Sequence, residues 1–171
     1  IERSVSLAGP TYSDVPPDGG TPAGRVDVPL PASSVVAWTW DPEAWAYRRW
    51  VQNRAYVDAL TGEQIACENV IIVYAQHWMT NIVEDANGAT AIGIALKGGG
   101  RAQIFRDGLA YEGTWWREEA RMLFQFIDAQ GNGLGEREPY AGYGRQLFLQ
   151  CLYELCLVAA CCPLFVRLEH D

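Results

Sequence analysis

The sequence has no cluster of basic residues. Of its 171 residues, 13 are Lys or Arg and 21 are Asp or Glu, so the formal net charge at pH 7 is -8. Proteins that bind nucleic acids or anionic membranes by charge carry basic stretches or basic faces. The charge pattern therefore argues against a nucleic-acid partner and against direct binding to an anionic membrane.

The sequence also lacks the short motifs of common catalytic and cofactor sites. It contains no GxSxG motif, and the glycine-rich KGGGR of residues 97–101 lacks the GK[ST] ending of a phosphate-binding loop. His77 is one of two histidines, and we favour a strand-end residue packed beside Trp78 over a catalytic role. We predict no catalytic residues and no cofactor.

Metal-binding motifs are missing as well. Cys67 stands alone, and the four cysteines between residues 151 and 162 lack the CxxC spacing and the histidines of a structural zinc site. DAQGNG (128–133) begins like a calcium-binding loop, but Pro139 occupies the twelfth position, where a bidentate Glu is required. We expect no metal site and predict a hairpin turn at DAQGNG.

No stretch before residue 146 keeps a helical periodicity for more than two turns. The seven Trp, eight Tyr and five Phe favour pleated sheets instead. Short runs rich in β-branched and aromatic residues alternate with turn residues. We predict an all-β fold, a mainly antiparallel sandwich or barrel-like sheet of about five to eight strands joined by short hairpins.

Composition divides the chain into three parts. Residues 1–25 are rich in Pro, Gly and Ser and predict a linker from an upstream domain, whereas residues 26–148 predict a single β domain. Residues 149–171 predict an irregular, apolar, Cys-rich tail. Within the β domain, VVAWTW (35–40) and WAYRRWV (45–51) flank a turn and predict a hairpin.

VIIVY (70–74) is apolar at every position and predicts a central strand that is buried on both faces.

Asp107-Gly108 lies between alternating hydrophobic residues and predicts a type I′ hairpin turn, which places Gln103 opposite Glu112. We expect the core face to carry Ala102, Ile104, Leu109, Tyr111 and Trp115. The other face then carries Arg101, Gln103, Phe105, Glu112, Thr114 and Trp116. Glu112 and Arg101 lie diagonally across this hairpin, and we favour an ion pair between them over a catalytic role for Glu112.

The seven tryptophans are too many for one small core, and exposed aromatic residues on β scaffolds often contact sugars or proteins. The candidate binding residues are Trp116, Glu112, Arg101, Phe105, His77 and Trp78. An alternative is a glycan hydrolase, which needs two carboxyl groups about 5 to 9 Å apart. That alternative would require Glu112 to meet Glu68 or Asp58.

Four segments in order carry a family resemblance: VVAWTWDPEAWAYRR (35–49), VDALTGEQIACENVIIVYA (57–75), GGGRAQIFRDGLAYEGTW (98–115) and FIDAQGNGL (126–134). Together they resemble the C-terminal region of the YerB-type bacterial lipoproteins, which contain a domain of unknown function, and the resemblance covers about residues 15–145. It implies an extracytoplasmic protein held at the outer face of a membrane by a lipidated Cys upstream, with a further N-terminal domain. It implies no catalytic residues.

These observations together favour a non-enzymatic, extracytoplasmic binding or scaffold domain of the bacterial cell envelope. We expect its partner to be an envelope protein or a cell-wall glycan. Contact with the membrane is expected only through the upstream lipid anchor. The glycan hydrolase with paired carboxylates is the alternative.

Four interpretations of the end of the chain stay open. LFLQCL (147–152) could supply a last strand, or the run could form a buried helix. A membrane segment is the third, and Gln150, Glu154 and Pro163 weaken it. We favour a non-native tail, such as an out-of-frame coding end, because an extracytoplasmic domain rarely leaves four clustered thiols unpaired.

Overall fold

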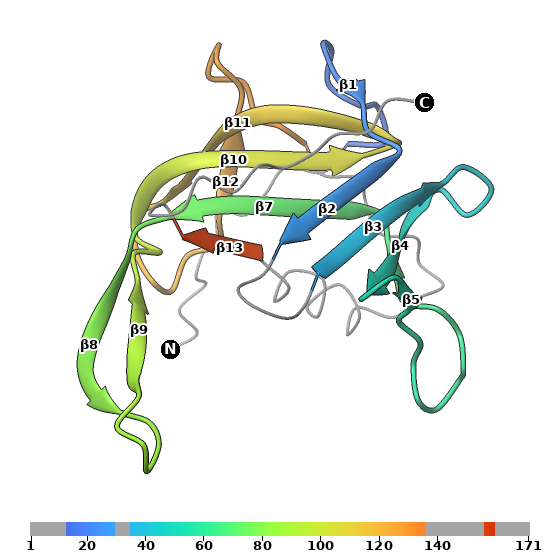
Figure 1. Cartoon of the computed structure of the whole chain (residues 1–171). Coiled ribbons are helices and arrows are strands. Elements are labelled where there is room, and N and C mark those ends of the chain that lie inside the picture. Colours follow the sequence, from blue (N-terminus) through green and yellow to red (C-terminus); the bar gives the residue numbers. More distant parts are fainter. Residues whose placement is uncertain (1–12, 30–34, 136–155, 160–171) are drawn as a thin grey trace, which may run out of the picture.

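A computed structural model describes residues 13–29, 35–135 and 156–159 (Figure 1). Within those ranges all regular secondary structure is β-strand. The strands form three sheets. The six-stranded sheet has the order β1 (Thr21–Pro22), β11 (Leu109–Arg117), β10 (Gly98–Arg106), β7 (Asn69–Ala75) and β13 (Cys156–Ala159), and β12 (Gln125–Ile127) also pairs with β11. All described pairs are antiparallel except β13 with β7, so the predicted all-β, mainly antiparallel class is confirmed.

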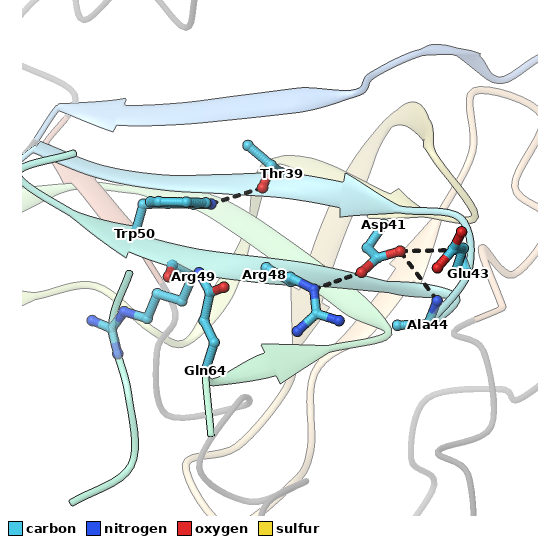
Figure 2. Close-up of polar contacts among 8 residues, drawn as sticks. All are labelled: Thr39, Asp41, Glu43, Ala44, Arg48, Arg49, Trp50 and Gln64. Atoms are coloured by element: carbon cyan, nitrogen blue, oxygen red, sulfur yellow. Dashed lines mark hydrogen bonds and ion pairs between the residues drawn. The ribbon is translucent and has the colours of Figure 1, made fainter. Parts of the chain in front are cut away.

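The five-stranded sheet contains the predicted tryptophan-rich hairpin. Its order is β2 (Arg25–Pro29), β3 (Val35–Asp41), β4 (Ala46–Val51) and β5 (Arg54–Ala55), and β6 (Ala66–Cys67) also pairs with β4. On the hairpin, Asp41 accepts hydrogen bonds from the backbone N–H groups of Glu43 and Ala44, which closes the turn, and from Arg48 Nε at 2.6 Å (Figure 2). Trp50 Nε1 donates to Thr39 Oγ1 at 2.7 Å.

The two larger sheets pack face to face as a sandwich. The buried residues between them come from both sheets: Ala23, Val26, Val28, Val36, Trp38, Tyr47, Val70, Ile72, Phe105 and Ala110. A second cluster lies on the opposite face of the six-stranded sheet and consists of Val73, Ala75, Ala102, Ile104, Tyr111, Trp115, Phe126 and Leu134. Strand β7 contributes to both clusters, so the predicted central strand with two buried faces is confirmed.

The β10–β11 hairpin has the predicted turn and register. Asp107 and Gly108 both have positive φ, 56° and 73°, as a type I′ turn requires, and Gln103 pairs with Glu112. Gly108 is also needed for space, because a Cβ there would lie 2.9 Å from Cδ1 of Trp40 on the other sheet. The expectation of one core face was incomplete, since Phe105 on the other face is 0% exposed. The five-stranded sheet covers that face near the turn.

Two residues of the predicted linker, 1–25, belong to strand β1. Residues 21 and 22 form β1, which pairs with β11, and Ala23 is 0% exposed. A Pro/Gly-rich composition does not prevent this, because proline is tolerated on an edge strand. The packed domain therefore includes at least part of the predicted linker.

Only Cys156–Ala159 of the predicted irregular tail is described, and it forms β13, parallel to β7. LFLQCL and the other predicted tail residues lie outside the described residues. No helix long and apolar enough to cross a membrane occurs in the part of the chain that the structure covers. DAQGNG forms the predicted turn, in which Asp128 Oδ1 accepts hydrogen bonds from the backbone N–H groups of Gln130 and Asn132.

The third sheet is a two-stranded ribbon of β8 (His77–Val83) and β9 (Thr90–Ile94). The ribbon projects from the end of the six-stranded sheet that lies away from β3 and β4 (Figure 1). We call residues 77–94 the arm.

Arg106, the last residue of β10, joins three segments at the turn end of the hairpin. Its guanidinium is 0% exposed and donates to Asp107 Oδ2 at 2.7 Å, to the carbonyl of Gly135 at 2.6 Å and to the carbonyl of Ser13 at 2.8 Å. A buried guanidinium is tolerated only where its donors are satisfied in this way.

Replacing Arg106 by Met should lower the free energy of unfolding by about 3 to 5 kcal/mol, because the buried Asp107 carboxylate and two backbone carbonyls lose their donor. Urea unfolding followed by tryptophan fluorescence measures the loss. The control is Arg121→Met. The ion pair of Arg121 with Glu119 is exposed, so its loss should lower the free energy of unfolding by less than about 1 kcal/mol. Equal stability of the two variants would contradict the structural role given to Arg106.

Candidate functional site

One face of the six-stranded sheet packs against the five-stranded sheet near the Asp107-Gly108 turn. Farther from that turn, the same face carries a polar and aromatic surface. It consists of Tyr74 on β7, Arg101 and Gln103 on β10, and Glu112 and Trp116 on β11. The pairings of β10 with β7 and with β11 place these residues on adjacent strands. We call this group the platform.

The polar side chains of the platform form one connected hydrogen-bond network. Arg101 binds Glu112 in a bidentate manner, with Nε to Oε2 and Nη2 to Oε1 both at 3.0 Å. Gln103 Nε2 donates to Glu112 Oε1 at 2.6 Å, and Tyr74 OH donates to Gln103 Oε1 at 2.7 Å. The predicted contact between Glu112 and Arg101 is therefore confirmed.

The guanidinium of Arg101 also lies over the ring of Tyr74, with Cζ 4.6 Å from the ring centroid. A bidentate carboxylate on one side and an aromatic face on another leave few orientations for this cation. The side chains of Arg101 and Glu112 are still 56% and 62% exposed. The platform thus presents charged groups to solvent in a fixed geometry.

The network sets the charge of the carboxylate. Partial burial by itself would raise the pKa of Glu112, but the hydrogen bonds from Arg101 and Gln103, with the charge of Arg101, outweigh it and lower the pKa. The hydrogen bond with Glu112 likewise raises the pKa of Arg101. Glu112 is therefore ionised at neutral pH and is poorly suited to act as a general acid.

Trp116 forms the apolar end of the platform. It is 48% exposed and its indole lies across Gly99, where a Cβ would be 2.9 Å from Cε3 of the ring. Trp116 lies four residues after Glu112 on β11, so the backbones of the two residues are about 13 Å apart along the strand. Trp116 offers a flat aromatic surface beside the polar network.

The other candidate binding residues lie elsewhere. Phe105 belongs to the core between the two sheets and is 0% exposed, so it cannot contact a partner, because the five-stranded sheet covers it. His77 and Trp78 begin β8 in the arm. His77 is half-buried with Nδ1 2.9 Å from the carbonyl oxygen of Ala75, and Trp78 is 51% exposed.

The candidate binding residues drawn from the sequence did not include Tyr74 and Gln103. Gln103 could have been found, since its predicted position opposite Glu112 already placed it within reach of that carboxylate. Tyr74 depends on the pairing of β7 with β10, which are separated by the whole arm in the sequence. No local pattern specifies that pairing.

The structure does not bring Glu112 together with Glu68 or Asp58. Asp58 accepts hydrogen bonds from the backbone N–H groups of Leu60 and Thr61 in the loop between β5 and β6, which belong to the other large sheet. Glu68 directly precedes Asn69 of β7, and Asn69 pairs with Arg106 of β10. Arg106 lies three residues beyond Gln103, the partner of Glu112, and β7 lies two strands away from β11. The backbones of Glu68 and Glu112 are therefore about 14 Å or more apart, and the buried side chains of Val70 and Phe105 lie between them on that face.

Potential metal ligands are dispersed in the same way. Within residues 13–29, 35–135 and 156–159, no three His, Cys, Asp or Glu side chains are grouped so that they could hold a metal ion.

A family model matches the sequence, and a solved structure is similar to the fold. The family model described as "Protein of unknown function (DUF3048) C-terminal domain" matches residues 26–136. The crystal structure of the YerB protein from Bacillus subtilis is similar to this chain, with a TM-score of 0.52 and 25% sequence identity, over 67% of this chain and 37% of YerB. The chain therefore spans much less than two thirds of YerB. No curated protein matches the sequence.

The lowered pKa of Glu112 predicts a pH-dependent contribution to stability. A carboxylate whose pKa falls on folding stabilises the protein above its ordinary pKa of 4.5, and this contribution is lost as the pH falls through the folded pKa. The wild type should exceed Glu112→Gln in stability by less than about 1 kcal/mol at neutral pH, because the pair is exposed, and the difference should shrink as the pH falls below 4.5. Urea unfolding at neutral and at acidic pH measures it.

In an Arg101→Gln background the same substitution at Glu112 should have little effect at either pH, because the partner charge is gone. A difference that persists unchanged at low pH would contradict the assigned role of the ion pair.

Proposed function

The chain belongs to the family of DUF3048 C-terminal domains, as its motifs predicted, and we propose that it is a non-enzymatic binding domain of the bacterial cell envelope. The platform is the binding surface in this proposal. The observation that carries it is the combination of an exposed indole, Trp116, with a locked network of donors and acceptors around Glu112.

A glycan is the partner that suits this surface best. The flat apolar side of one sugar ring can stack on the indole of Trp116, while hydroxyl groups of a neighbouring sugar unit in the same chain can bind the carboxylate of Glu112 and the guanidinium of Arg101. Because Arg101, Gln103 and Glu112 are already held by one another, little side-chain entropy is lost on binding. An envelope protein is the second partner class that we expected from the exposed aromatic residues.

The hydrolase alternative is less well supported by the same geometry. Glycan cleavage needs a protonated carboxyl group and a second carboxylate nearby, whereas the network lowers the pKa of Glu112 and keeps it ionised. Asp58 lies in a loop of the other large sheet, and Glu68 directly precedes β7, two strands away from Glu112. Binding without cleavage is therefore the simpler use of the platform.

The proposed location rests on the resemblance to YerB-type lipoproteins, which implies a lipid anchor upstream and a position outside the cytoplasm. The negative net charge of -8 is consistent with a partner other than nucleic acid. Attachment to the membrane through the lipid, rather than through this domain, agrees with the lack of basic clusters in the sequence.

Trp116→Ala should weaken binding of soluble peptidoglycan fragments by about tenfold or more, because the stacking surface is lost. Isothermal titration calorimetry with the wild type and the variant measures the change. Trp45→Ala is the matched control, since Trp45 is 54% exposed but lies in the β3–β4 turn of the other sheet. That variant should bind the fragments as the wild type does.

Chromatography of the titrated fragments separates binding from hydrolysis. Intact fragments after prolonged incubation with the wild type support the binding domain. Shortened fragments with the wild type, but not with Glu112→Gln, would establish the hydrolase instead. Absence of any binding, or equal loss with Trp45→Ala, would overturn the glycan platform.

A further inference from the structure

Five of the large apolar side chains that are exposed in the described residues lie on the arm. Its exposed apolar side chains are Trp78, Met79, Ile82, Val83 and Ile92, with exposed fractions of 51% to 67%. Within the described residues, β8 and β9 pair only with each other. A two-stranded ribbon is marginally stable in water by itself, and apolar patches of this kind mark surfaces that a partner covers.

The arm nevertheless has a defined shape. Trp78 and Gly93 are paired, and the indole of Trp78 lies over the glycine so closely that a Cβ there would collide with it. Thr80 Oγ1 donates to the carbonyl of Ala91 across the ribbon at 2.8 Å. The arm is therefore held as a preformed docking element rather than a loose loop.

A face of the arm, rather than its edge, is the surface available to a partner. The register between β8 and β9 shifts between Met79 and Val83, and such bulges interrupt the edge that another strand would need. Met79 and Ile92 are directly paired, so their side chains lie on the same face, 67% and 60% exposed.

Charges lie at both ends of the arm. Glu84 and Asp85 are exposed at its tip, and Lys97, the single lysine of the sequence, is exposed just beyond its base. Arg117, which pairs with Gly98 near the base, already donates to the carbonyls of Met122 and Ala120. Lys97 is thus the cation placed to receive an acidic group at this end.

We propose that the arm packs antiparallel against the arm of a second copy of this chain, about a two-fold axis. This arrangement covers the Met79 and Ile92 face of each copy with the same apolar face of the other, as a self-complementary interface requires. It also brings Glu84 and Asp85 of each tip to Lys97 of the other copy. A parallel arrangement would instead place the two acidic tips together.

The first test is the mass of the whole chain in solution by light scattering over a dilution series, with a reductant present to keep the cysteines from cross-linking. The expected mass is twice the 19.0 kDa of the chain. Met79→Asp and Ile92→Asp should each weaken the dimer by about 100-fold, because each buries an unpaired charge at the interface. Leu60→Asp is the control, since Leu60 is 96% exposed in the loop between β5 and β6 and should leave the dimer intact.

The charges test the antiparallel arrangement separately from folding. Lys97→Glu and Glu84→Lys should each weaken the dimer by about tenfold, and the two changes combined in one chain should restore it. Carbodiimide, which joins an amine to a carboxylate with loss of water, should link Lys97 to Glu84 or Asp85 of another copy. Within one copy these groups are more than about 20 Å apart along the arm.

A monomer at every concentration would overturn the proposal. So would a dimer that Met79→Asp and Ile92→Asp do not affect although far-ultraviolet circular dichroism shows that both variants are folded. Cross-links between the tips of the two arms, in place of links from tip to Lys97, would also overturn it. The last outcome concerns a version of the protein that extends beyond this chain. If that version is monomeric and its Met79 and Ile92 are protected from hydrogen exchange, another domain covers the arm in place of a second copy.

Discussion

The type I′ turn at Asp107-Gly108 is the constraint on which the rest of this structure depends. It fixes the register of β10 against β11, and in a strand pair a slip of one residue would exchange the two faces. With this register, Trp115 enters the core while Glu112 faces Gln103 in the platform. The glycine also lets Trp40 of the other sheet approach the turn, so the same dipeptide sets how closely the sheets meet.

Two arginines on β10 show how position along one strand decides function. Arg106, at the turn end, is buried between segments and satisfies carbonyl groups from distant parts of the chain. Arg101, five residues earlier, lies where the five-stranded sheet no longer covers the strand, and it is 56% exposed. The first arginine stabilises the domain, whereas the second presents a held charge to solvent.

The platform and the arm adjoin each other along the chain but differ in chemistry. Strand β7 continues beyond the body as β8, and β9 leads back into β10 (Figure 1). Tyr74 is the next-to-last residue of β7. The platform is polar, charged and internally hydrogen-bonded, whereas the arm is apolar along its length with charges at its ends. The two proposed surfaces therefore differ in the chemistry of the partner that each would suit.

The sequence by itself determined the local features: the all-β class, the tryptophan-rich hairpin, the turn at Asp107-Gly108 and the pairing of Glu112 with its neighbours on β10. These follow from strand periodicity and turn chemistry, which act over a few residues. Only the tertiary structure decided that Phe105 is buried, that Tyr74 joins the platform and that residues 21–22 form an edge strand. Each of these depends on pairing or packing between segments distant in the chain, and periodicity carries no information about which distant segment covers a face.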